Sequence, residues 1–340
     1  MENLDLRVLA DALAWRKSGH AVTLVTVVET WGSAPRPPGA LLAVRDDGVV
    51  SGSVSGGCVE DDLIAQTRAA LQANPESASP AAALPSMLAY GVSKEEAARF
   101  GLPCGGTLRL VREPLRDVAW IEDLLDRTAR HALIARQLTL ATGEVQLLPA
   151  VRGQTLQFDG SVLTCVLGPK WRLLLIGAGQ LSQAVAHMAR MLDFEVLVCD
   201  PREEYAATLR MDGVSRVEGM PDDAVRALVP DAHTAIVALT HDPKLDDMAL
   251  LEALVSDAFY VGALGSRRNQ AARKQRLAEH FDLSAQALAR LHGPVGLSLG
   301  AKTTAEIAVS IVAHLVQVKN EARPVAAASA GLCGVVNSGV

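Results

Sequence analysis

A buried strand that runs straight into a glycine turn and then a helix constrains the fold of this chain more than any other feature. The strand and turn are WRLLLIGAG at 171–179, and a helical pattern follows over 180–193. Further apolar strands alternate with helical patterns, at 194–200, 234–240 and 258–266. Such alternation specifies a parallel sheet with helices on both faces. We therefore predict the α/β class, with a Rossmann-like, doubly wound parallel sheet over residues 169–320.

The N-terminal half shows a different pattern. A helix is predicted over 4–18, a strand over 21–29, and several short strands over 132–167. A hairpin turn is predicted at 46–48, helices over 59–72 and 117–131, and turns at 142–143 and 159–160 between the short strands. We predict an α+β domain over residues 1–168. The end of the chain, 321–340, is rich in Ala, Gly and Ser and is predicted to be a mobile tail.

Composition excludes several classes of protein. The formal net charge of −6 disfavours binding to a nucleic-acid backbone. Five scattered cysteines argue against a disulfide scaffold, and no cysteine pair has the spacing of a zinc site, so no metal site is predicted. No apolar run reaches the about 18 residues of a membrane span. We expect a cytoplasmic protein that does not bind membranes.

The turn after the first C-terminal strand has the pattern of a nucleotide-binding turn. Gly177 permits a tight turn, and Gly179 allows the backbone to approach a pyrophosphate at a helix N-terminus. Asp200 closes the next strand, near the place of a ribose-binding acid. The third glycine position is Ser182, which is small enough for helix–strand packing. The alternatives are a Rossmann-shaped domain without a ligand site and a different phosphorylated ligand.

Polar and glycine residues follow two other strands of the predicted sheet. His241 comes after 234–240, and Gly265 and Ser266 come at the end of 258–266. Ligands of open α/β sheets bind at the carboxyl ends of the strands, so these three residues are candidate contacts. His241 can hydrogen-bond a phosphate or carry a proton, or it can serve as a helix cap or a structural hydrogen-bonding group.

Two cysteines of the N-terminal half lie beside paired glycines. Gly56 and Gly57 precede Cys58 at the start of a predicted helix, and Cys104 precedes another glycine pair. Glycines leave a thiol uncrowded and expose backbone N–H groups, and a helix N-terminus favours the thiolate. The alternative is that both cysteines are small buried apolar residues. Arg36, in a proline-rich loop, is the best candidate to bind an anion, or else forms a surface ion pair.

At these motifs the chain resembles the XdhC/CoxI family of molybdenum-cofactor chaperones. The resemblance covers roughly residues 5–115 and 170–316. The chain departs from the family pattern at Thr304 and His314, where proline and glutamate are typical. The motifs that carry the resemblance are WGSAPRPPGA, GSVSGGCVEDDL, GLPCGG, LLLIGAGQLSQAVA, CDPREEYA, LTHDPKLD, YVGALGSRR and GPVGLSLGAKTTAEIAVSI.

The resemblance implies a function that spacing alone does not show. Proteins of this family bind the molybdenum cofactor, as molybdopterin or its cytosine dinucleotide form, and protect it. They support its sulfuration with a cysteine desulfurase and help to insert it into a xanthine dehydrogenase-type apoenzyme. By resemblance, Cys58 and Cys104 are sulfur or cofactor contacts, and Gly177, Gly179 and Asp200 form the Rossmann site. A fragile cofactor is then expected between the two domains.

Two other hypotheses stay open at this point. A nicotinamide-dependent oxidoreductase, using NAD(P) at the same turn, would show turnover of reduced nicotinamide with a small carbonyl compound. An interaction protein with a vestigial site would carry no pterin or nucleotide. Whether the chain is an enzyme in the ordinary sense is left undecided. A homodimer through the helical stretch 305–318 is an option, although we expect this helix to pack against its own sheet.

Overall fold

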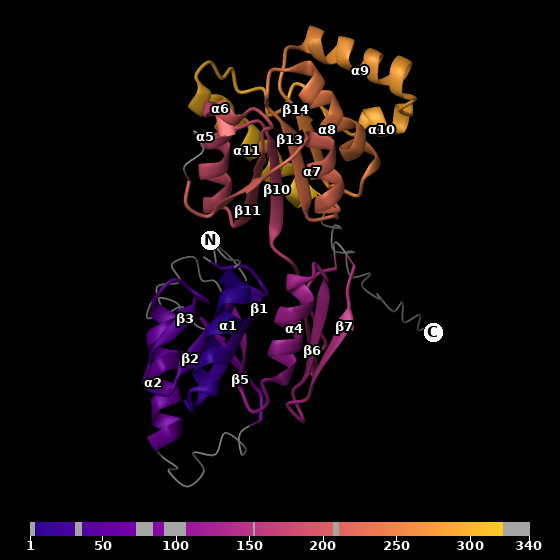
Figure 1. Cartoon of the computed structure of the whole chain (residues 1–340). Helices are drawn as coiled ribbons and strands as arrows, with labels where there is room; N and C mark the ends of the chain where they lie inside the picture. Colours follow the sequence, from indigo (N-terminus) through magenta and orange to yellow (C-terminus); the bar gives the residue numbers. More distant parts are fainter. Residues whose placement is uncertain are drawn as a thin grey trace, which may run out of the picture.

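The computed structural model describes residues 4–30, 36–72, 84–91, 107–151, 154–206 and 211–321. Figure 1 shows two parts stacked end to end. The N-terminal part is formed by residues up to the end of strand β9 (Val162–Leu167), and the C-terminal part begins at strand β10 (Trp171–Ile176). The predicted tail beyond residue 321 lies outside the described residues.

An antiparallel sheet of five strands, in the order β3-β2-β1-β5-β4, forms the first layer of the N-terminal part. Its central strand β1 is buried on both faces. Because side chains alternate along a strand, Leu24 packs into one apolar cluster and its neighbour Val25 into another. The bounds are β1 Val22–Thr30, β2 Leu41–Arg45, β3 Val50–Gly52, β4 Ser86–Tyr90 and β5 Leu108–Pro114, with helices α1 Leu4–Lys17 and α2 Cys58–Gln72.

A second antiparallel sheet, in the order β7-β6-β9-β8, completes the N-terminal part. Val28 and Val111 of the first sheet share an apolar cluster with Leu138 and Leu163 of the second. The two sheets are therefore held together by apolar packing. The remaining bounds are α4 Ala119–Ala129, β6 Ile134–Thr139, β7 Val145–Pro149 and β8 Gln157–Phe158.

The C-terminal part is built on a parallel sheet of six strands, in the order β12-β11-β10-β13-β14-β15. Its central strands β10 and β13 are apolar beyond their first residues, with Arg172 and Thr234 at the amino end, as buried parallel strands are. The order reverses at β10, which lies between β11 and β13. The other strands are β11 Phe194–Cys199, β12 Val214–Val217, β13 Thr234–Ala238, β14 Tyr260–Ala263 and β15 Leu291–His292.

Helices cover both faces of the parallel sheet. Helices α5 (Gln180–Met191) and α11 (Thr304–Glu321) bury their apolar sides in one cluster, and the second cluster lies on the opposite face. The doubly wound α/β fold is thereby confirmed. Helix α11 packs against its own sheet, as expected. The remaining helices are α6 Glu203–Ala206, α7 Pro221–Leu228, α8 Pro243–Val255, α9 Arg267–Phe281 and α10 Ala285–Ala289.

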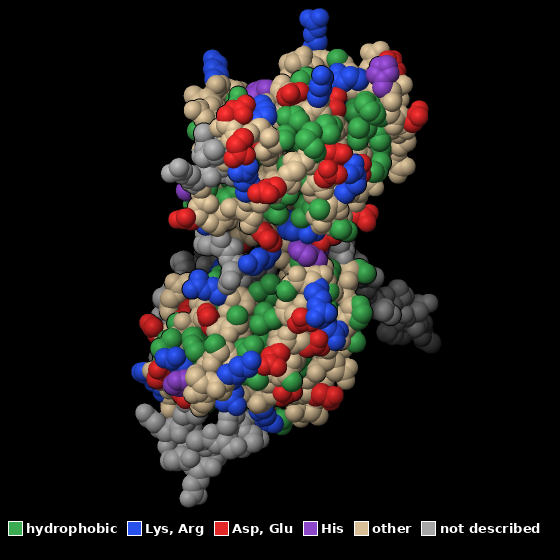
Figure 2. Space-filling view, in the orientation of Figure 1, with side chains coloured by type: hydrophobic (Ala, Val, Ile, Leu, Met, Phe, Trp, Pro, Cys, Tyr) green, Lys and Arg blue, Asp and Glu red, His purple; other side chains and the backbone are tan. Residues whose placement is uncertain are grey.

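A contact between a histidine and a carboxylate joins the two parts. Asp231 of the C-terminal part lies 3.5 Å from Nδ1 of His131 and 3.2 Å from Nη2 of Arg172. Figure 2 shows basic and histidine side chains gathered at this waist of the molecule. Because His131 follows α4 and Asp231 precedes β13, their contact links the N-terminal part to the amino edge of the parallel sheet, and Arg172 of β10 holds Asp231 from within the C-terminal part.

Some elements were missed by the sequence pattern. Strands β4, β12 and β15 are short, and β4 and β12 contain exposed residues, so their hydrophobic signal is weak. By contrast, the spacing of Thr303 and Glu306 in the sequence predicts a capping box, and the structure contains it at the start of α11: Glu306 N–H donates to Thr303 Oγ1 (3.2 Å), and Thr303 N–H donates to Glu306 Oε2 (3.0 Å). Over the described ranges, no helix combines the length and the apolar character needed to cross a membrane.

Candidate functional site

The glycine turn after β10 has the geometry that the sequence predicts. Gly177 has φ +106°, and an added Cβ would lie 3.2 Å from backbone atoms of Leu239 and Thr240, so only glycine fits there. Gly179 is the N-cap of α5, and nothing lies within 4 Å of where its Cβ would be. Ser182 is almost fully buried, which fits close helix–strand packing. The N-terminus of α5 therefore faces open space that an anion can approach.

Asp200 holds this turn in place. Its carboxylate accepts hydrogen bonds from Ala178 N–H (2.9 Å) and from Arg202 Nε (2.9 Å) and Nη2 (2.8 Å). Burial alone raises the pKa of Asp200, but the bonds from Arg202 and Ala178 outweigh it and lower that pKa. Both oxygens are occupied, so a contact to a ribose would require Arg202 to move away. The ribose role of Asp200 stays a prediction.

His241 lies at the same carboxyl edge, directly after β13. Its φ is +61°, an unusual value for a residue other than glycine, and its side chain is exposed. The cap of α8 is Asp242, whose Oδ1 accepts from Lys244 N–H (2.9 Å). His241 is therefore not the helix cap. Its exposed ring remains a candidate contact for a ligand at this edge.

Gly265 and Ser266 form the next loop along the edge. Gly265 has φ +143°, and Ser266 caps α9 by accepting a hydrogen bond from Asn269 N–H (3.2 Å). This side chain therefore has a structural role, and a ligand role for it stays a prediction. The loop backbone is tied down at Leu264, whose carbonyl accepts from Gln270 Nε2 (3.0 Å) and Arg273 Nη1 (3.2 Å).

A buried ionic cluster, which sequence reasoning missed, connects these loops. Arg273 Nη2 donates to Asp246 Oδ2 (2.9 Å), and Arg273 Nε donates to Asp247 Oδ1 (3.1 Å). Asp246 Oδ1 in turn accepts from Thr240 N–H (3.1 Å) and Oγ1 (2.7 Å). Arg273 thus fixes the loops before α8 and α9 relative to each other. No sequence signal marks it, because the basic residues of this helix resemble an ordinary solvated face.

The glycine loop before Cys58 differs from the expectation. We expected its N–H groups to be exposed, but Val54, Ser55 and Gly57 all donate to the Glu60 carboxylate at 2.8 Å. Gly56 N–H also donates to Glu60, at 3.2 Å. That prediction is wrong because the chain supplies its own anion. Burial alone raises the pKa of Glu60, but these bonds and those from the serine hydroxyls lower it to about 2.

The two candidate cysteines differ in what the structure describes of them. Helix α2 begins at Cys58, so the predicted position at a helix N-terminus is confirmed for its backbone. Cys104 lies outside the described residues. The described thiols, Cys165 and Cys199, are buried, and burial raises the pKa of Cys165 to about 12 and that of Cys199 to about 11. Neither of these two thiols has the character of a reactive thiolate.

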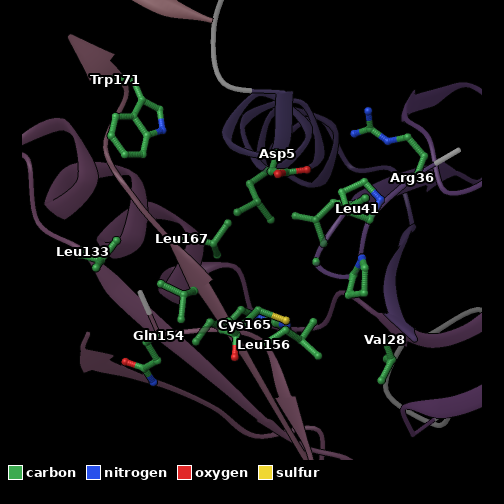
Figure 3. A pocket seen from close by; sticks show the side chains of 18 of the residues that line it. Asp5, Val28, Arg36, Leu41, Leu133, Gln154, Leu156, Cys165, Leu167 and Trp171 are labelled. Atoms are coloured by element: carbon green, nitrogen blue, oxygen red, sulfur yellow. The ribbon is translucent and has the colours of Figure 1, made fainter. Parts of the chain in front are cut away.

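Arg36 lines a cavity of about 690 Å³ at the junction of the two parts. Its Nε donates to Ser53 O (3.2 Å), which joins the cavity wall to the loop that leads to Cys58. Figure 3 shows Arg36 and Trp171 on opposite sides of this junction cavity, with Asp5 between them. Asp5, Cys165 and Lys319 also line it, and sequence reasoning missed them because they come from distant segments.

The structure does not bring the candidate residues of the N-terminal part together with those at the carboxyl edge of the parallel sheet. The junction cavity is lined by Trp171 and His233, which lie at the amino ends of β10 and β13. Gly177 and Asp200 lie at the carboxyl ends, and the six residues of β10 place them about 20 Å away. Figure 1 shows the start of α5 pointing away from the N-terminal part. The expected single cleft between the domains, with the glycine turn on one wall, is therefore wrong.

Two family models match the chain. The model described as the XdhC Rossmann domain matches residues 173–315, and the model of the XdhC and CoxI family matches residues 15–78. The first match contains the glycine turn and the loops of the carboxyl edge. The second contains Arg36 and the loop held by Glu60. The candidate residues thus fall inside matched regions, except Cys104, which lies between them.

Curated relatives are similar over nearly the whole chain. One, of Escherichia coli strain K12, is the molybdenum cofactor insertion chaperone PaoD, 28% identical and covering 92% of this chain and 87% of the relative. Another, of Bacillus subtilis strain 168, is named as a probable component of xanthine dehydrogenase, and it is 26% identical and covers 93% of this chain and 98% of the relative.

A solved structure has the same fold. It is the crystal structure of a xanthine dehydrogenase from Bacillus halodurans, with a TM-score of 0.73 and 23% identity. The likeness covers 94% of this chain and 96% of that one, so both parts of the fold are shared.

Proposed function

Because this chain belongs to the XdhC and CoxI family, we propose that it binds the molybdenum cofactor and delivers it to an apoenzyme. The observation that carries the proposal is the likeness to a molybdenum cofactor insertion chaperone over 92% of the chain. The geometry supports it with a cavity of about 690 Å³, within the range of small-molecule sites, and with an open helix N-terminus after Gly179. Both features suit a ligand that carries a phosphate.

The client of this delivery is a molybdenum hydroxylase of the xanthine dehydrogenase or aldehyde oxidase type. The name of the Bacillus subtilis relative supports this choice. In our proposal the chain holds the cofactor, as molybdopterin or its cytosine dinucleotide, away from water until the client takes it. Gly177, Gly179, His241 and Gly265 are proposed to contact the phosphates of a nucleotide at the carboxyl edge, either that of the cytosine dinucleotide form or that of a second ligand such as NAD(P).

We include sulfuration in the proposal. A cysteine desulfurase would supply sulfur while the cofactor is bound, and Cys58 and Cys104 are the thiols proposed to lie near the metal. The start of α2 at Cys58 supports the first of these, because a helix N-terminus stabilises a thiolate. Several points stay proposals: the client, the desulfurase, the cofactor form, a homodimer and a cytoplasmic location.

Cofactor transfer to a client tests the proposal. Molybdenum cofactor released without oxygen from a purified molybdenum hydroxylase is mixed with this chain and passed through a desalting column. The protein fraction is then added to the client apoenzyme. Client activity should appear with the loaded chain and not with a loaded column blank or with heat-denatured chain. No retained pterin and no client activity would contradict the proposal.

The proposed thiols can be tested separately. Cys58→Ala combined with Cys104→Ala should leave the fold intact and abolish maturation of the client, because the sulfur contacts are lost. The measurement is client activity together with circular dichroism of the chain. Cys199→Ala, which removes a buried thiol of raised pKa, is the matched control and should mature the client normally. Full client activity from the double variant would remove the thiols from the account.

An NAD(P)-dependent oxidoreductase is the alternative function. The turn at Gly177 and the exposed His241 favour it, since a dinucleotide needs the same carboxyl edge. Against it, the Asp200 carboxylate is already occupied by Arg202. Oxidation of reduced nicotinamide by any small carbonyl compound, followed by absorbance, would favour the alternative over the chaperone.

A further inference from the structure

The junction cavity has walls that match one chemical type of ligand. Its lining is apolar over much of its surface and comes from three sources: the two antiparallel sheets and the amino edge of the parallel sheet. Leu24 and Leu41 contribute from the first sheet, Leu167 from the second, and Trp171 from β10. The two faces of a planar ring would be desolvated there, which favours its binding.

One carboxylate lies among these apolar walls. Asp5, in the first turn of α1, points into the cavity in Figure 3. Burial raises its pKa, while Arg36 and a hydrogen bond from the Leu41 backbone act in the opposite direction. A carboxylate has two acceptor oxygens and can pair with two parallel N–H donors of a ligand. Such a donor edge occurs in heterocycles that contain an amino group beside a ring N–H.

The cations of the cavity outnumber its acids. Arg36 and Lys319 contribute positive charge at separate places, since Lys319 Nζ lies 4.8 Å above the ring of Trp171. Arg136, which also lines the cavity, is buried and paired with Glu113 through Nη2 at 2.6 Å. Its Nε is also buried and has no acceptor among the described residues. The cavity therefore offers positive charge to an anionic ligand through Arg36 and Lys319.

We propose that the junction cavity holds the phosphorylated pterin of the cofactor, with Asp5 pairing with the amino edge of the pterin and Arg36 binding the phosphate. This inference rests on the proposed function and adds a location and two contacts to it. A pterin has an amino group beside a ring N–H, which suits Asp5, and a planar ring, which suits the apolar walls. The guanidinium of Arg36 pairs with phosphate bidentately. The carboxyl edge is then left for the nucleotide of another ligand.

The test uses two probes, of which only one carries a phosphate. One is molybdopterin cofactor released from a molybdenum hydroxylase, and the other is unphosphorylated pterin. Binding to the full chain is measured by anaerobic equilibrium dialysis, with pterin fluorescence as the readout. Arg36→Gln should weaken binding of the cofactor at least tenfold and leave the unphosphorylated pterin unchanged. Asp5→Asn should weaken binding of both probes at least tenfold. A purely structural role for Arg36 would not separate the probes in this way.

Matched controls come from an exposed ion pair on the same part of the chain. Arg45 pairs with Asp47 at 2.7 Å in a surface turn, so Arg45→Gln and Asp47→Asn make the same chemical changes outside the cavity. Both should bind both probes as the unmodified chain does. Arg36→Lys, which keeps the charge, should restore part of the cofactor affinity. Thermal unfolding of each variant shows whether it is folded, and the comparison uses only folded variants.

The outcomes distinguish this inference from the function beneath it. If the unmodified chain retains no cofactor, the proposed function fails. If it retains the cofactor and the Asp5 and Arg36 variants bind it equally well, the junction cavity is overturned as the site. Gly179→Asp then locates the alternative, because a Cβ fits there and the added carboxylate would repel a phosphate at the start of α5. Loss of binding in that variant alone would assign the cofactor to the carboxyl edge.

Discussion

At the scale of single residues, Glu60 shows how an internal anion organises a loop. Its carboxylate satisfies the N–H groups of the loop before α2 and the hydroxyls of Ser53 and Ser55. The sequence predicted the loop and the helix start. It could not show that the N–H groups were already occupied, because an acid in a first helical turn is also common at exposed positions.

The loop should lose stability when Glu60 is neutralised. Glu60→Gln removes charge-assisted hydrogen bonds and should lower the free energy of unfolding by roughly 1.5–3 kcal/mol at neutral pH. The folded pKa of about 2 lies below the ordinary value of 4.5, so this stabilisation is present above pH 4.5 and is lost as pH falls toward 2. Urea unfolding at pH 7 and pH 3 measures it.

The control for this experiment is Glu144→Gln, since Glu144 is exposed in a turn. It should change the free energy of unfolding by less than about 0.5 kcal/mol at both pH values. A Glu60→Gln chain as stable as the unmodified one at pH 7 would show that the loop does not depend on the carboxylate.

At the scale of elements, the strands and helices with strong periodicity were predictable from the sequence. The strands they pair with and the helices they contact were not. The strand before Gly177 and the capping box of α11 follow from local residues alone. Strand β15 has two residues, and its pairing with β14 depends on the rest of the sheet. Likewise, Arg273 reaches Asp246 and Asp247 from another helix, and no local pattern encodes such a contact.

Breaking this ionic cluster should loosen the carboxyl edge. Arg273→Met leaves Asp246 buried without its cation and should lower the free energy of unfolding by roughly 3–5 kcal/mol. Amide hydrogen exchange should increase in the loops around Thr240 and Leu264, which the cluster connects. Arg268→Met, on the exposed side of the same helix, is the matched change and should be nearly neutral. Equal effects of the two substitutions would contradict the structural role of the cluster.

At the scale of the whole molecule, two regions suited to a ligand lie at opposite edges of one parallel sheet. The sequence predicted residues of both regions, Arg36 in one and Gly177 in the other. It could not place them, because the way in which two folded parts dock depends on side chains scattered along the chain. Asp5, Trp171 and Lys319 come together only in the folded molecule.

Global stability should also depend on pH through a pair of histidines. His292 stacks on Tyr260 at 4.4 Å and lies 4.7 Å from the ring of His314. Burial, with a contribution from His314, lowers the pKa of His292 to about 4. Since the unfolded value is near 6.5, the stability that the neutral ring gives is present above pH 6.5 and is lost as pH falls toward 4.

This pH effect can be isolated by substitution. His292→Phe keeps an aromatic stack but has no titrating group. Between pH 7 and pH 5 the free energy of unfolding of this variant should therefore fall by about 1 kcal/mol less than that of the unmodified chain. The difference is small because the ring remains partly accessible to water. Urea unfolding at the two pH values measures the difference. The free energy of unfolding of His280→Asn, a change at an exposed position of α9, should fall as much as that of the unmodified chain. A pH dependence of His292→Phe equal to that of the unmodified chain would contradict the assignment.

The central claim is that this chain carries the molybdenum cofactor. The most direct measurement is mass spectrometry, with metal analysis, of small molecules released from the chain after purification without oxygen from cells that make the cofactor. The account predicts a phosphorylated pterin dithiolene together with molybdenum in equal amounts. Release of a nicotinamide nucleotide alone, or of no pterin from a folded chain that still matures its client, would contradict it.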